Sequence, residues 1–149
     1  MNAFGHRDYT LLGRVRVQLD DAGLTIANPG GFVEGINIHN LLTAEPHGRN
    51  PCLMDALKRT GLAERAGRGI DRICEGSLHY GRPLPDYTAS NERNVSVYLQ
   101  RSAPDVEFVR MLAEEQERTG KTMPVNGLLI LNMLRNERRC TFETMNKKF

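Results

Sequence analysis

The sequence predicts an α/β fold, a two-layer sandwich in which a mostly antiparallel sheet carries helices on one face, followed by a helical segment at the carboxyl end. Two observations support this prediction. Residues 14–19 and 94–100 alternate apolar and polar side chains, which is typical of strands with one buried face. Between residues 50 and 80, and again after residue 105, apolar side chains recur at the spacing of amphipathic helices.

The first two strands are expected to form a hairpin. In residues 14–19, Val15, Val17 and Leu19 share one side, which predicts a strand with one solvent-exposed face at a sheet edge or in a half-exposed sheet. Residues 20–23, Asp-Asp-Ala-Gly, have the composition of a tight turn, so residues 24–27 should return antiparallel to the first strand. Residues 94–100 are expected to join these two strands.

Start and stop signals define the predicted helices. Asn50 precedes Pro51 as a cap, and Gly61 ends this helix. Three further helices are predicted over residues 67–80, 105–118 and 126–138, with Asp105 as a cap of the second of these. Residues 36–44 are ambiguous, with Asn37 a candidate cap of a short helical turn, and Thr141 is a weak start signal for one more helix.

Domain organisation follows from a break in the apolar pattern near Ala103. Ser102, Pro104 and Asp105 interrupt it, so we predict an α/β domain over residues 1–102 and a helical segment over residues 103–149. Asn2 and His6 have helical spacing, which suggests the end of a helix that begins before Met1.

Composition excludes several protein classes. Twenty basic and eighteen acidic residues give a net charge of +2, which does not by itself indicate a nucleic-acid binder. No apolar run approaches the roughly 20 residues needed to span a bilayer, and the amino terminus lacks the apolar core of a signal peptide, so a cytoplasmic protein is expected. Three widely spaced cysteines without a C-x-x-C pair argue against a disulfide framework and against a zinc site.

Three turns rich in glycine or arginine are candidate anion sites. They contain Asn28, Gly30 and Gly31; Arg49 and Asn50; and Gly67, Arg68 and Gly69. The second and third lie where predicted helices begin, where free amides and the helix dipole favour a phosphate. The alternative interpretation is that glycine and proline only shape the turns, and that Arg49 and Arg68 pair with carboxylates such as Glu64 and Asp71.

With these motifs in place, the chain resembles the RecG-helicase carboxy-terminal-like domain found in bacterial regulators behind a Schlafen/AlbA-type domain. The matching pieces are Asn2-Ala3, residues 6–9, residues 24–26, Asn28-Pro29-Gly30-Gly31, Arg49-Asn50-Pro51, Glu64, Gly67, Gly69-Ile70 and Arg72-Ile73. The segment from Asp105 is similar to the start of a winged helix.

This resemblance implies the fold of the ATPase domains of gyrase, MutL and sensor histidine kinases, which bind ATP and Mg²⁺. It would place Asn2 at the metal, residues 28–31 in the first glycine box and residues 67–69 in the second. Asn28-Pro29-Gly30-Gly31 has no carboxylate where those ATPases recognise adenine. A glutamate that would orient water should lie one helical turn before Asn2, so we expect no hydrolysis by this chain. A Gly-Lys-Ser/Thr phosphate loop, which a helicase of that class needs, is also missing from the sequence.

Two functions remain open. The first is a ligand-sensing or structural module of a DNA-binding transcriptional regulator, and the second is an ATP-binding or ATPase domain. The nucleotide or anion candidates are Asn2, His6, Asn28, Gly30, Gly31, Arg49, Asn50, Gly67, Arg68 and Gly69, with His6 equally a structural residue. The DNA-binding candidates, which could also be a solvated face, are Arg135, Arg138, Arg139, Lys147 and Lys148.

Overall fold

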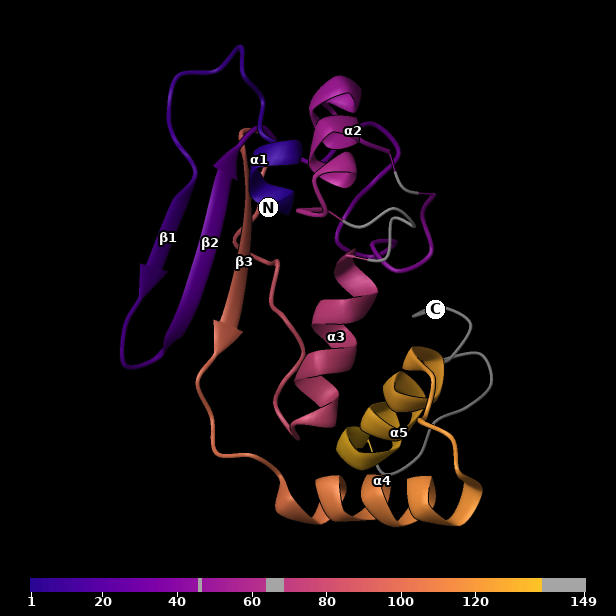
Figure 1. The fold of residues 1–149 in the computed structure, drawn as a ribbon. Helices are drawn as coiled ribbons and strands as arrows, with labels where there is room; N and C mark the ends of the chain where they lie inside the picture. Colours follow the sequence, from indigo (N-terminus) through magenta and orange to yellow (C-terminus); the bar gives the residue numbers. More distant parts are fainter. Residues whose placement is uncertain (46, 64–68, 138–149) are drawn as a thin grey trace.

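The structure is a computed structural model that describes residues 1–45, 47–63 and 69–137. Figure 1 shows a sheet with helices to one side of it and a pair of helices beyond the carboxyl end of its last strand. In chain order the elements are α1 (Asn2–Gly5), β1 (Arg16–Leu19), β2 (Gly23–Pro29), α2 (Pro51–Arg59), α3 (Gly69–His79), β3 (Asn94–Gln100), α4 (Val106–Thr119) and α5 (Val125–Glu137). The predicted α/β class and the additional carboxy-terminal helices are confirmed.

The sheet has the order β1-β2-β3 and both pairings are antiparallel. The hairpin turn forms as predicted, because the Asp20 carboxylate accepts hydrogen bonds from the amides of Ala22 (2.9 Å) and Gly23 (3.0 Å). Arg16 lies opposite Ala27 in the register, and Asn94 lies opposite Pro29. β2 is therefore the central strand, and it leads directly into the turn at residues 28–31.

The first strand differs from the prediction in its burial. β1 is exposed along its whole length, and the side chains expected to be buried, Val17 and Leu19, are 65% and 79% exposed. Its position at the sheet edge was expected, but its apolar face has no cover among the described residues. Alternation along a strand shows that its two faces differ and leaves open what packs on each face.

The start of α2 corrects a second expectation. Asn50 occupies the cap position before Pro51, as predicted, but its side chain makes no capping hydrogen bond. Its amide instead donates to the carbonyl oxygens of Gly5 (2.9 Å) and Arg7 (2.7 Å). The Asn50 side chain therefore binds carbonyls that are distant in the sequence and does not cap α2. The helix begins at Pro51, whose fixed φ suits the first helical position.

The other predicted helices are present, and those of their predicted ends that fall within the described residues are shifted by one residue. The Asp105 carboxylate caps α4 by accepting from the Phe108 amide at 3.0 Å, and Gly120 ends this helix in a left-handed conformation. Residues 36–44 form successive turns, in which the Asn37 side chain accepts from the His39 amide at 2.8 Å. The start of the helix predicted at residue 67 and the helix predicted at Thr141 lie outside the described residues.

The main apolar core lies where α3, α4 and α5 meet (Figure 1). Its buried members are Leu78, Phe108, Leu112, Leu128 and Leu129. This cluster joins α3 to the carboxy-terminal helices, so it crosses the position predicted as a boundary at Ala103, and the division into two domains stays a prediction. None of the helices in the described part of the chain has the length and apolar character needed to cross a membrane.

We expect Leu78→Ala to lower the free energy of unfolding by about 2–5 kcal/mol, because Leu78 is fully buried at the centre of this cluster. Urea unfolding followed by circular dichroism measures the change. Leu134→Ala on α5 is the matched control, because Leu134 is 42% exposed, and its cost should be at most about 1 kcal/mol. Equal losses for the two variants would contradict the placement of the core.

Candidate functional site

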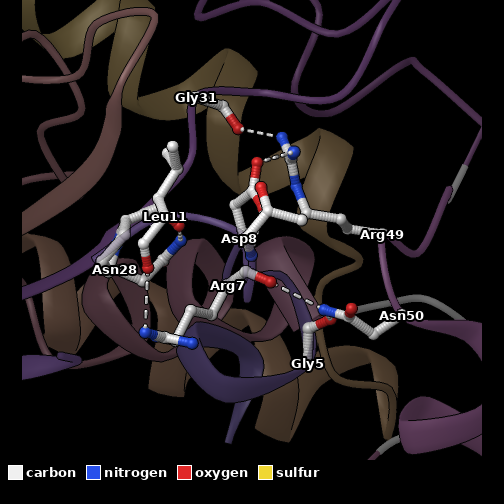
Figure 2. Close-up of polar contacts among 10 residues, drawn as sticks. Gly5, Arg7, Asp8, Leu11, Asn28, Gly31, Arg49 and Asn50 are labelled. Carbon is white, nitrogen blue, oxygen red and sulfur yellow. Dashed lines mark hydrogen bonds and ion pairs between the residues drawn. The ribbon is translucent and has the colours of Figure 1, made fainter. Parts of the chain in front are cut away.

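The candidate site is built around α1 and the residues that follow it. The Asp8 amide donates to the Pro29 carbonyl at 2.8 Å. The Asn50 side chain binds the carbonyls of Gly5 and Arg7 (Figure 2). Gly69 also approaches this segment, because a Cβ on Gly69 would lie 2.5 Å from the Asn2 side-chain nitrogen. The turns at 28–31, at 49–50 and at Gly69 are thus brought together by contacts with residues 2–8.

Arg49 connects two of these turns directly. One guanidinium nitrogen donates to the Asp8 carboxylate at 3.0 Å and another donates to the Gly31 carbonyl at 2.9 Å (Figure 2). The planar, forked guanidinium suits two acceptors at once. The Arg49 Nε atom is buried and has no hydrogen-bond partner among the described residues. Arg49 therefore pairs with a carboxylate, as the alternative interpretation held, but the carboxylate is Asp8.

The glycine turn is closed by its own neighbours. Gly30 has φ = +94°, and its amide donates to the Arg93 carbonyl at 2.9 Å. The Gly31 amide donates to the Glu92 carbonyl at 3.1 Å. A Cβ on Gly30 would lie 2.6 Å from the Asp8 Cβ, so only glycine fits this close approach. Both amides that were predicted to face an anion are engaged within the chain.

Asn28 lies at the end of β2, where the resemblance would place adenine recognition. Its side chain is 5% exposed, and its amide nitrogen donates to the Pro29 carbonyl at 3.2 Å. Asn28 supplies a carboxamide where those ATPases have a carboxylate to accept from adenine. The Gly30 and Gly31 amides and the Arg49 guanidinium, which could donate to phosphate, are already bonded within the chain. A ligand here would have to displace existing bonds.

Two titratable groups at the site are perturbed. Hydrogen bonds from the Thr10 hydroxyl (2.6 Å) and amide (2.9 Å) lower the pKa of Asp8, and the charges of Arg49 and Arg7 lower it further. Burial lowers the pKa of His6, and the charge of Arg49 adds to this effect. His6 is therefore held neutral at pH 7, in the form that can accept a proton or coordinate a metal.

The remaining predicted residues are placed as follows. Asn2 begins α1, and no group of three or more His, Cys, Asp or Glu side chains that could hold a metal is found among the described residues, so Mg²⁺ at Asn2 stays a prediction. Arg135 lies on α5, where it donates to Asp105 at 3.1 Å and stacks on Phe108. The other candidates lie outside the described residues, namely Gly67, Arg68, Arg138, Arg139, Lys147 and Lys148.

Sequence reasoning did not identify Asp8 as the partner of Arg49. The spacing of Asp8 and Thr10 is a local signal, because an aspartate often binds the amide two residues on. Arg49 lies 41 positions further along the chain. No pattern in a single sequence joins residues so far apart.

Comparison with known proteins identifies the family of the chain. A family model described as "Putative ATP-dependent DNA helicase recG C-terminal" matches residues 13–99. The chain belongs to this family. No curated protein is a significant match to the chain.

A solved structure supports the fold. The DIP2311 protein from Corynebacterium diphtheriae superimposes with a TM-score of 0.84 at 22% sequence identity. The match covers 99% of this chain and 31% of that protein, so this member of the RecG carboxy-terminal family spans under a third of the longer chain. The likeness extends over α4 and α5 as well as the sheet, and at this identity it shows the fold alone.

We expect Gly30→Ala to destabilise the protein more than Gly35→Ala. Both glycines have positive φ, so each substitution carries a backbone cost of about 1 kcal/mol. A Cβ at Gly35 meets nothing within 4 Å, whereas one at Gly30 meets Asp8 and Arg49. The crowding should add about 1–3 kcal/mol, measured by urea unfolding. Equal losses of unfolding free energy for the two variants would show that Gly30 is not tightly packed against Asp8 and Arg49.

Asp8→Asn should weaken the dependence of stability on acid pH. The folded-state pKa of Asp8 lies below its unfolded value, so its contribution is complete above the unfolded value near 3.8 and is lost as the pH falls through the folded value. The urea midpoint between pH 6 and pH 2 should therefore fall less steeply in the variant. Asp55→Asn on α2 is the control, and an unchanged profile in Asp8→Asn would be inconsistent with the Thr10 and Arg49 contacts.

Proposed function

We propose that this RecG carboxy-terminal family member is a ligand-sensing or structural module, without hydrolytic activity of its own, within a longer cytoplasmic and DNA-binding transcriptional regulator. One observation carries the proposal. Arg49, whose guanidinium reaches the glycine turn, is bonded to the Asp8 carboxylate and the Gly31 carbonyl. The turn is thus held in a closed arrangement by side chains of the same chain.

The Asp8–Arg49 contact supplies a mechanism for sensing. Both side chains are partly exposed, at 20% and 26%, so water and dissolved ions can compete with the ion pair. An anion that took the place of the Asp8 carboxylate on Arg49 would free Asp8 and loosen the bond to Gly31. Since Asp8 is also bonded to Pro29, the change would reach the end of β2.

The alternative function is an ATP-binding or ATPase domain. It is supported by the family description, which names an ATP-dependent DNA helicase. His6 adds a neutral imidazole next to Arg49. Against it stand the carboxamide of Asn28 and the internal bonds of the Gly30 and Gly31 amides. An enzyme of this kind would also need a carboxylate that activates the attacking water.

Contact with DNA through the carboxy-terminal helices is the least supported part of the proposal. It rests on the resemblance of the segment after Asp105 to a winged helix and on the basic residues near the chain end. Arg135 is held by Asp105 and Asn132, so it would have to leave these partners to reach a phosphate.

Titration with ATP, with and without Mg²⁺, followed by calorimetry, tests the proposal. We expect no phosphate release above a no-protein control. Asp8→Asn should bind tripolyphosphate more tightly than the unsubstituted chain, because it removes the carboxylate that competes for Arg49. Asp55→Asn, which removes an exposed carboxylate on α2, should leave the affinity unchanged.

One outcome would overturn the proposal, and a second would reduce it to a structural role. Phosphate release that Arg49→Gln abolishes would establish the enzyme instead. Equal tripolyphosphate affinity of Asp8→Asn and the unsubstituted chain would exclude a sensing role for Arg49 and leave a structural module.

A further inference from the structure

A hollow of about 350 Å³ lies on the opposite face of the sheet from Asn28. Its floor is formed by Arg16, Ala27, Pro29 and Asn94. The register pairs Arg16 with Ala27 and Asn94 with Pro29, so these four residues share one face of the sheet. Because side chains alternate along a strand, Asn28 belongs to the other face. The hollow therefore opens on the sheet face opposite Asn28, and Pro29 is the residue that it shares with the glycine turn.

The wall of the hollow is formed by residues 12–14, which precede β1. Arg7 holds this segment, because its guanidinium donates to the carbonyls of Gly13 (2.6 Å) and Leu11 (3.3 Å). Gly13 also lies against Pro29, where an added Cβ would be 3.0 Å from the ring. These bonds give the hollow a defined shape.

Three arginines line the hollow: Arg14, Arg16 and Arg93. All three are exposed, and their side chains make no hydrogen bond or ion pair within the described part of the chain. The lining residues include no carboxylate. The three positive charges are thus not balanced by a negative side chain in the lining, so the hollow favours an anion.

The chemistry of the hollow indicates phosphate. Arginine presents a planar fork of donors that matches phosphate and binds it in bidentate fashion. Arg16 lies on β1, and Arg93 directly precedes β3, two strands away. Strands are about 4.8 Å apart, so the charges span roughly 10 Å of sheet, more than one phosphate group covers. A line of phosphates along a nucleic-acid strand covers this width.

We propose that this arginine hollow binds the backbone phosphates of a nucleic acid and does not read its base sequence. The charges of the hollow are exposed, and none of its charged side chains is buried where it would orient one small ligand. The inference goes beyond the proposed function, because it places a nucleic-acid contact on the sheet of the α/β domain and does not depend on nucleotide sensing or on the carboxy-terminal basic residues.

The test uses the full chain and a fluorescent duplex of about 20 base pairs, with anisotropy measured at roughly 50 and 200 mM NaCl. The triple variant Arg14→Gln, Arg16→Gln, Arg93→Gln should bind at least about tenfold more weakly at the lower salt concentration. Its slope of log affinity against log salt should become shallower by about 0.9 for each phosphate contact that is lost. A scrambled duplex should behave as the first one does.

The matched control removes three exposed charges elsewhere, on α2, after β3 and on α4, as Arg59→Gln, Arg101→Gln, Arg110→Gln. It should keep the salt slope of the unsubstituted chain. The lysine triple variant at positions 14, 16 and 93 retains the charge and should keep most of the affinity. It therefore shows whether a loss of affinity in the glutamine variant comes from the missing charge or from damage to the fold. Melting temperatures check that each variant is folded.

An equal loss in the control triple, or an unchanged slope in the hollow triple, would overturn the proposal. If the hollow triple loses affinity for tripolyphosphate but not for the duplex, the hollow takes a small anion and the nucleic-acid assignment is wrong. Failure of ATP or tripolyphosphate to act at Arg49 would leave this result untouched, because Arg49 is not part of the hollow.

Discussion

The arrangement of the amino-terminal half depends on donors that satisfy the carbonyl groups at the end of α1. This helix has four residues, too few to be stable alone. Its following carbonyls would be left without partners if Asn50 did not donate to Gly5 and Arg7. Arg49, the next residue back, ties Asp8 to Gly31. Two adjacent side chains thus hold α1, the glycine turn and the start of α2 in one polar cluster.

This cluster and the apolar core stabilise different parts of the chain by different means. The core at α3, α4 and α5 is a set of leucine and phenylalanine side chains removed from water, whereas the cluster around α1 is a set of hydrogen bonds and one ion pair. Burial of apolar surface is insensitive to the arrival of an anion. Partly exposed polar contacts can exchange partners at small cost. We therefore expect a ligand to change the contacts of the polar cluster around α1 more readily than the packing of the carboxy-terminal helices.

Much of the fold could be predicted from local patterns. Alternation located the first and third strands, and the turn at residues 20–23 located the second. Gly81 and Gly120 marked helix ends because both adopt positive φ. The errors have a common origin. Alternation gave no information on what covers β1, and local capping rules could not anticipate that Asn50 is taken by carbonyls 43 and 45 positions away. The Asp8–Arg49 pair and the arginine hollow escaped prediction for the same reason, since the tertiary fold creates both.

The close approach of Gly81 to Asp105 has a consequence for the motion of the molecule. The Asp105 amide donates to the Gly81 carbonyl at 2.9 Å, and a side chain at Gly81 would meet the Asp105 backbone at 2.7 Å. With Leu78 buried just before it, this junction leaves little room for a hinge between α3 and α4. Because the apolar cluster and this contact join α3 to α4 and α5, we expect a displacement of α3 at its Gly69 end to be passed on to both carboxy-terminal helices.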